Sequence, residues 1–163
     1  PKNWKLHKNK FIDHQSQSNL AHKHGQMYSD KITEYASVLF FLSKTETRND
    51  NSSSASLLAV VEAITDTKLT PKTYHNSLVQ LMQSGRVKYK IGARKANVEI
   101  NAYQFSQLVF ESDLSGIRRH HIVYSTAFPN HIVSFIGTYT TREQRQILLD
   151  SIKQFSSLPT VKK

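Results

Sequence analysis

Apolar residues are concentrated in short continuous runs along this chain. The runs at residues 36–44 (ASVLFFLSK) and 56–64 (SLLAVVEAI) are apolar at odd and even positions alike and are too short to favour a helix. This pattern predicts strands that are covered on both faces of a sheet. Residues 102–112, 116–128 and 130–141 predict three further strands, separated by the turn signals DLSG and PN.

Residues 86–101 show a different pattern, in which charged and apolar residues alternate. The stretches RVKYKIG and KANVEIN predict an exposed hairpin whose turn lies around Gly92 and Arg94. The first 35 residues are polar and rich in histidine, and they predict short strands and loops that pack on the sheet. Residues 45–56 consist of polar turn-forming residues and predict an exposed loop.

Two segments combine helical periodicity with capping signals. Thr70 and Pro71 predict the start of a helix and Gly85 predicts its end. Thr141 and Gln144 have the spacing of a capping box at the start of a C-terminal helix. The residues on the stripes that these helices would bury are Tyr74, Leu78, Leu81 and Met82 in the first, and Ile147, Leu148, Ser151, Ile152 and Phe155 in the second.

The predicted order of elements, β-β-α-β-β-β-β-β-α, indicates an α+β domain. Strands that are apolar on both faces need cover on both sides, so we expect an antiparallel β-sheet sandwiched between helices. A length of 163 residues and a hydrophobic fraction of 38% suit one domain that spans residues 1–163. We expect this domain to be a monomer.

The ordered set of these segments resembles the PsbP family. That family includes the photosystem extrinsic subunit, bacterial DcrB-type periplasmic lipoproteins and a nuclear-import factor that binds the Ran GTPase. The matching stretches are PKNW, ASVLFFLSK, SLLAVVEAI, TPKTY, NAYQFSQLVFES and GTYTTREQRQILLDSIKQF. The resemblance implies an α/β/α sandwich without a shared catalytic centre, and it implies a small GTPase of the Ran type as one acidic partner.

The composition narrows the classes of partner and of chemistry. Lys and Arg outnumber Asp and Glu by 22 to 12, and the resulting net charge of +10 favours anionic partners. Cysteine is absent, which excludes disulfides, Cys-bearing zinc sites and thiol catalysis. No run of 18 apolar residues predicts a transmembrane segment. We expect a bacterial, periplasmic or secreted protein, whose signal peptide would precede Pro1 because PKNWKLHKNK has no apolar segment after its charges.

The candidate binding residues are basic residues of the predicted hairpin and of IRRHHIVYS at residues 117–125. In the hairpin, cations that alternate with Val87, Tyr89 and Ile91 would lie on one face and bind an acidic protein surface. Anionic lipid or nucleic acid is the alternative ligand, and protection of an exposed edge strand against aggregation is a non-functional explanation. The candidate binding residues are Arg86, Lys88, Lys90, Arg94, Lys95, Arg118 and Arg119.

The histidines do not predict a metal site. On a strand, Arg118 and His120 point to one face, and Arg119 and His121 point to the other. Adjacent histidines therefore cannot share a metal ion, and His131 would lie well along the ladder from them. We predict surface or structural roles for these side chains.

The remaining chemistry-bearing residues form no recognisable catalytic motif. His22 and His24 would share a face of a strand, but a short His-rich tract is compositional evidence only, and we assign it no metal ligand. The chain contains neither a GxSxG nucleophile elbow nor a glycine-rich phosphate loop. We therefore predict no catalytic residue, no cofactor and no enzymatic activity.

Overall fold

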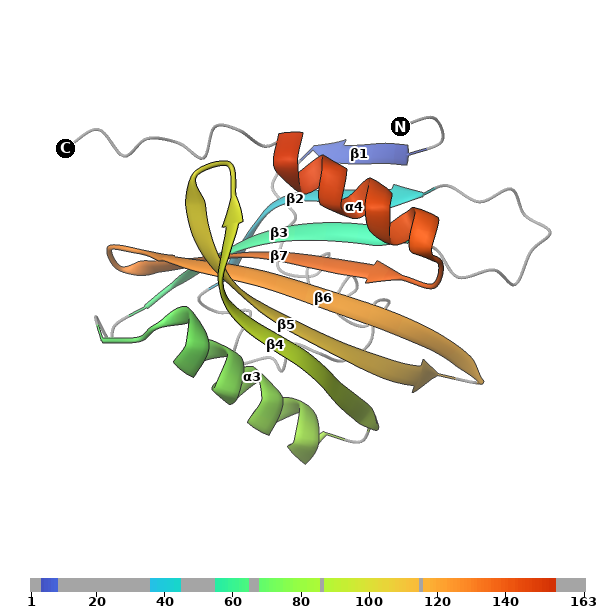
Figure 1. Cartoon of the computed structure of the whole chain (residues 1–163), viewed down its shortest axis with the longest axis horizontal. Helices are drawn as coiled ribbons and strands as arrows, with labels where there is room; N and C mark the ends of the chain where they lie inside the picture. Colours follow the sequence, from blue (N-terminus) through green and yellow to red (C-terminus); the bar gives the residue numbers. More distant parts are fainter. Residues whose placement is uncertain are drawn as a thin grey trace.

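The structure is a computed structural model that describes residues 4–8, 36–44, 55–64, 68–85, 87–114 and 116–154. The described part of the chain forms one seven-stranded sheet with the order β1-β2-β3-β7-β6-β5-β4 (Figure 1). All neighbouring strands in it are antiparallel. The strands are β1 (Trp4–Lys8), β2 (Ala36–Lys44), β3 (Ser56–Ala63), β4 (Tyr89–Ile100), β5 (Tyr103–Leu114), β6 (Ile117–Phe128) and β7 (His131–Tyr139).

The helices α3 (Pro71–Ser84) and α4 (Arg142–Gln154) pack against opposite faces of this sheet. Along β6, Ile122 belongs to the buried cluster that contains Leu148 and Ile152 of α4. The next residue, Val123, belongs to the cluster that contains Leu78 of α3. Successive strand residues point to opposite faces, so we call these the α4 face and the α3 face. The prediction of an α+β fold with an antiparallel sheet is confirmed.

The two capping signals mark the helix starts as predicted. At α3, the Thr73 amide donates to Thr70 Oγ1 over 3.2 Å, and the Thr70 amide donates to Thr73 Oγ1 over 2.9 Å. At α4, the Gln144 amide donates to Thr141 Oγ1 over 3.2 Å, and the Thr141 amide donates to Gln144 Oε1 over 3.3 Å. Each reciprocal pair satisfies donors that a helix start leaves free. The buried residues are Tyr74, His75, Leu78, Val79 and Met82 of α3, and Gln144, Leu148, Ser151 and Ile152 of α4.

A glycine in β7 lets α4 approach the sheet closely. Gly137 is buried, and a Cβ atom placed on it would lie 3.1 Å from both Ile122 Cγ2 and Leu148 Cδ1. Both atoms belong to residues without solvent exposure. The absence of a side chain at Gly137 therefore contributes to the packing of α4 against the centre of the sheet.

The predicted hairpin around Gly92 and Arg94 is wrong, because residues 89–100 form the single strand β4. This strand pairs with β5 over its whole length, with irregularities between Ile91 and Arg94 and between Lys95 and Val98. Each irregularity is a bulge, in which β4 has one residue more than the facing part of β5. Residues that favour a turn therefore lie within one continuous strand. The described chain accordingly has four strands after α3, where we expected five.

Several predictions concern residues that lie outside the described part of the chain. They include the expected packing of residues 1–35 on the sheet, except for β1, which pairs with β2. The histidine pair His22 and His24, the candidate Arg86 and the helix residue Phe155 also lie outside it. Neither helix that the structure describes is long and apolar enough to cross a membrane.

Candidate binding surface

The basic residues of β4 lie at an outer edge of the sheet. β4 is the last strand in the sheet order, so only β5 pairs with it in the described structure. Lys90, Arg94 and Lys95 in β4, and Lys88 just before it, are all exposed. Among the described residues, none of the four forms an ion pair with a carboxylate. We call these four residues the basic edge.

The basic edge is distributed over both faces of the sheet, and the expectation of a single charged face is wrong. Lys90 and Lys95 pair with β5 residues of the α4 face, whereas Arg94 pairs with Leu108 of the α3 face. Arg94 Nη1 donates a hydrogen bond of 2.7 Å to Asn76 Oδ1 of α3. In a regular strand Lys90 and Arg94 would share a face, and the irregularity between Ile91 and Arg94 reverses that relation.

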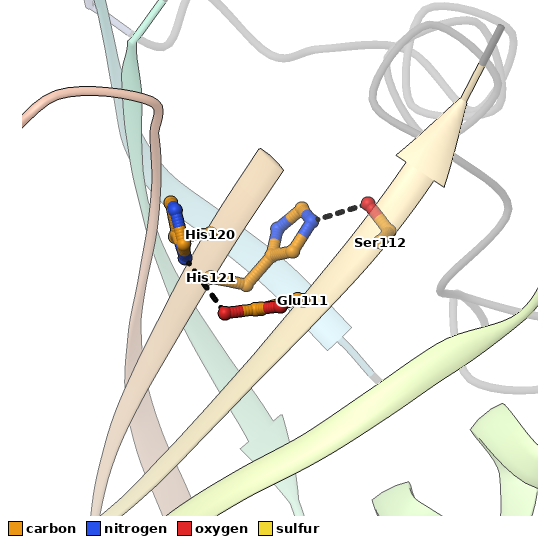
Figure 2. Close-up of polar contacts among 4 residues, drawn as sticks. All are labelled: Glu111, Ser112, His120 and His121. Carbon is orange, nitrogen blue, oxygen red and sulfur yellow. Dashed lines mark hydrogen bonds and ion pairs between the residues drawn. The ribbon is translucent and has the colours of Figure 1, made fainter. Parts of the chain in front are cut away.

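On the α4 face, one register row crosses four neighbouring strands. Lys90 of β4 pairs with Glu111 of β5, Glu111 pairs with His120 of β6, and His120 pairs with Tyr139 of β7. His120 Nδ1 lies 3.3 Å from Glu111 Oε1, with about one third of each side chain exposed, at 33% and 31% (Figure 2). The His120 ring stacks on Tyr139 with a centroid distance of 5.4 Å. Arg118 is exposed, and it lies on this face as predicted.

On the α3 face, His121 is buried in a polar network. Its Nε2 lies 2.8 Å from Ser112 Oγ (Figure 2), and its Nδ1 lies 3.1 Å from Thr138 Oγ1. The ring stacks on Phe110, with centroids 4.7 Å apart and an angle of 12° between the planes. The pKa of His121 is lowered to about 4, chiefly by burial and to a smaller extent by the nearby positive charge of Arg119. His121 is therefore neutral at physiological pH.

A second buried histidine links α3 to the sheet. His75 Nε2 lies 2.9 Å from Ser125 Oγ of β6, which lies 2.8 Å from Ser134 Oγ of β7. Burial lowers the pKa of His75 to about 4, with a smaller contribution from Arg94. This network was not predicted from the sequence. The signal in the sequence was a serine within the apolar part of each of two strands, Ser125 in β6 and Ser134 in β7, because a buried polar group needs a hydrogen-bond partner.

Comparison with known proteins identifies the fold. No protein-family model matches the chain, and no curated protein is similar to it in sequence. One similar solved structure is the cyanobacterial PsbP (CyanoP) of Synechocystis sp. PCC 6803, with a TM-score of 0.55 and 12% identity over 94% of this chain and 81% of that one. The chain has a PsbP-like fold.

Two other solved structures share this PsbP-like arrangement. LpqN, which is involved in cell envelope biogenesis of Mycobacterium tuberculosis, has a TM-score of 0.50 and 12% identity over 93% of this chain and 73% of its own. PA94 of Pseudomonas aeruginosa, a protein of unknown function, has a TM-score of 0.55 and 12% identity over 83% of this chain and 88% of its own. The resemblance to the PsbP family that the sequence segments indicated is confirmed at the level of the fold.

Within this PsbP-like domain, the described histidines do not converge on a metal. His120 and His121 lie on opposite faces of β6, as their alternation predicted, and Figure 2 shows their rings directed to different partners. His131 pairs with Phe128 at the other end of the same strand. Among the residues that the structure describes, no group of three or more His, Cys, Asp or Glu side chains is placed to bind a metal ion.

Proposed function

We propose that this PsbP-like domain is a non-catalytic binding or adaptor module that recognises an acidic protein surface. The observation that carries the proposal is the basic edge, with its four exposed cations on and beside the outermost strand. A net charge of +10 adds a long-range field that attracts acidic partners. A small GTPase of the Ran type falls within this class of partner. The finer architecture that we propose is an α/β/α sandwich, with α3 and α4 as its helical layers.

The charge pattern favours a protein over anionic lipid or nucleic acid. On the α4 face, cations alternate with carboxylates: Lys90 stands beside Glu111, and Arg118 stands beside Asp113. A membrane surface or a duplex presents one sign of charge and would be repelled by these carboxylates, whereas a protein surface can match both signs. Tyr89 is half-buried and packs edge-on against Phe110, with centroids 5.6 Å apart, so its ring is not free to stack on a base.

The buried Ser–His contacts support a non-catalytic role. Ser112 Oγ lies 2.8 Å from His121 Nε2, and Ser125 Oγ lies 2.9 Å from His75 Nε2. At such distances a histidine can activate a serine hydroxyl. The exposed fraction is 3% for Ser112 and zero for Ser125, however, so neither hydroxyl can meet a substrate from solvent. We therefore assign both contacts to the stability of the α3 face.

We further propose that the protein acts as a monomer at the bacterial cell envelope. The PsbP-like fold is shared with LpqN, a protein involved in cell envelope biogenesis. The absence of cysteine is compatible with an oxidising compartment, because no free thiol can form an unwanted disulfide there.

Charge reversal at the basic edge tests the proposal. We expect K88E/K90E/K95E to bind the acidic partner at least about tenfold more weakly than the wild type, because three attractive contacts become repulsive. The matched control K72E/R142E/K153E changes the net charge equally at exposed positions of the two helices and should bind normally. Affinity is measured against the protein that the wild type retains from a cell-envelope extract at physiological salt.

Parallel titrations with phosphatidylglycerol vesicles and with duplex DNA distinguish the alternative ligands. Binding to vesicles or DNA that disappears as salt rises, without a retained protein, would replace the adaptor function with polyanion binding. Equal losses in the two triple variants would show that net charge alone drives association and would contradict a role for the basic edge.

A further inference from the structure

Glu111 lies between the basic edge and a solvent-accessible histidine. On the α4 face, Lys90 of β4 pairs with Glu111 of β5, and Glu111 pairs with His120 of β6. Cross-strand neighbours have their Cβ atoms about 5 Å apart, so the Glu111 carboxylate is next to both cationic side-chain types. Its Oε1 lies 3.3 Å from His120 Nδ1 (Figure 2), whereas no ion pair joins it to Lys90 in the described structure. The carboxylate is therefore directed to the histidine, and its negative charge weakens the positive field of Lys90.

Both side chains of this pair are open to water. The exposed fraction is 33% for His120 and 31% for Glu111, so solvent protons can reach the histidine ring. Solvent-accessible histidine is the side-chain type that changes charge near neutral pH. His75 and His121 stay neutral in that range, because their pKa values are lowered to about 4, chiefly by burial. Of the histidines whose side chains the structure describes, the two that are open to solvent are His120 and His131, at opposite ends of β6 and β7.

The other groups that face His120 come from three neighbouring elements. Tyr139 of β7 stacks on its ring, with centroids 5.4 Å apart. Arg118 is the adjacent residue of β6 on this face, and it pairs with Asp113 of β5. Arg145 of α4 adds a positive charge further along β6. Within the described structure, Glu111 is thus the carboxylate in contact with the His120 ring.

One proton on the His120 ring changes the net charge of this part of the α4 face. Lys90 and Arg118 supply two positive charges, and Glu111 and Asp113 supply two negative charges, so the four residues are balanced while His120 is neutral. Protonation places a further positive charge in contact with Glu111. The imidazolium then offsets the carboxylate, and the Lys90 ammonium is left to attract an acidic partner.

We infer that His120 and Glu111 make binding at the basic edge dependent on pH, with tighter binding of the acidic partner when His120 is protonated. This inference rests on the proposed function and describes the regulation of the same surface. The domain would hold its partner more firmly in an acidic environment. Since coupling between two ligands is reciprocal, binding of the partner must also favour uptake of a proton from solvent by His120.

The test measures binding of a fluorescent oligo-aspartate peptide to the full chain at pH 7.5 and at pH 5.5, at constant ionic strength. Aspartate is ionised at both values, so a change in affinity reports on the protein. We expect binding about two- to fivefold tighter at pH 5.5, which is the effect of one exposed ion pair. Circular dichroism checks that every sample is folded at both pH values. Equal wild-type affinity at the two pH values would overturn the inference.

Three single variants assign the effect to the pair. His120→Gln should lose most of the pH dependence, whereas His131→Gln, the matched change at an exposed histidine, should keep it. Glu111→Gln removes the carboxylate charge and should bind at pH 7.5 about as tightly as the wild type binds at pH 5.5. Calorimetry in buffers of different ionisation enthalpy measures proton uptake, which should be smaller in His120→Gln. Equal proton uptake or equal pH dependence in His120→Gln and the wild type would overturn the inference.

The variant K88E/K90E/K95E separates failure of this inference from failure of the proposed function. Weak binding of this variant at both pH values, combined with an unchanged pH dependence in His120→Gln, would overturn the inference alone. Binding of the triple variant as tight as that of the wild type would instead show that the basic edge is not the binding surface. Absence of wild-type binding at both pH values would overturn the inference and the proposed function together.

Discussion

The free energy of unfolding is expected to fall as the pH decreases from about 6.5 to about 4. His75 and His121 both have a folded-state pKa of about 4, below the ordinary value of 6.5, because burial disfavours their charged forms. Between these values the unfolded chain binds protons that the folded chain does not, so stability rises with pH across this window. The contribution of the two histidines is complete above pH 6.5 and is lost on acidification.

Each histidine contributes up to about 3 kcal/mol to this loss, since one pKa unit corresponds to about 1.4 kcal/mol. The Glu62 carboxyl acts in the opposite sense, because burial raises its pKa and protonation then favours the folded state. Guanidinium denaturation at a series of pH values measures the slope. His121→Gln should be less stable at neutral pH but show about half the wild-type slope. A wild-type stability that stays constant from pH 6.5 to 4.5 would contradict buried neutral histidines.

Truncation of Phe110 is expected to destabilise the protein by about 3–5 kcal/mol, as is usual for a fully buried phenylalanine replaced by alanine. Phe110 has no solvent exposure, and its ring lies between Tyr89 on one side and His121 on the other. Phe110→Ala leaves a cavity and removes both ring contacts. Chemical denaturation at pH 7.5 measures the loss, away from the titration of the histidines.

The matched control for this variant is Phe128→Ala, which removes a half-buried ring at the far end of β6. We expect Phe128→Ala to lower the free energy of unfolding clearly less than Phe110→Ala does, because folding buries less apolar surface of Phe128 than of Phe110. The pKa of His121, followed by NMR, should also rise toward its ordinary value in Phe110→Ala, since water enters beside the ring. A cost below about 1 kcal/mol together with an unchanged His121 pKa would contradict the packing described for the α3 face.

Elements with strong local signals could be predicted from the sequence, and those that depend on distant pairing could not. Thr70 and Thr141 mark helix starts through hydrogen bonds to residues three positions away, so the information is local. The strand β4 carries Gly92 and Asn97, and Asn97 has a φ of 57°, which is typical of a turn. Its continuity depends on pairing with β5, which the local sequence does not reveal.

The candidate binding surface, too, could be predicted from the sequence only where local alternation decides it. Alternation along β6 was enough to place Arg118 and His120 on one face and Arg119 and His121 on the other. The contacts of His120 with Glu111 and of His121 with Ser112 depend on the register of β6 against β5, which separates the paired residues by nine positions. The bulge between Ile91 and Arg94 had a larger consequence, because it moved Arg94 to the face opposite Lys90.

Site-specific photo-crosslinking tests the central claim, that the basic edge contacts the acidic partner. A photoreactive amino acid replaces Lys90 in one protein and Lys72, which is exposed on α3, in another. Both proteins are irradiated at physiological salt with the cell-envelope extract. We predict one discrete crosslinked protein with an acidic surface from the Lys90 position and none from Lys72. The same crosslinked products from both positions, or none from Lys90, would contradict the account.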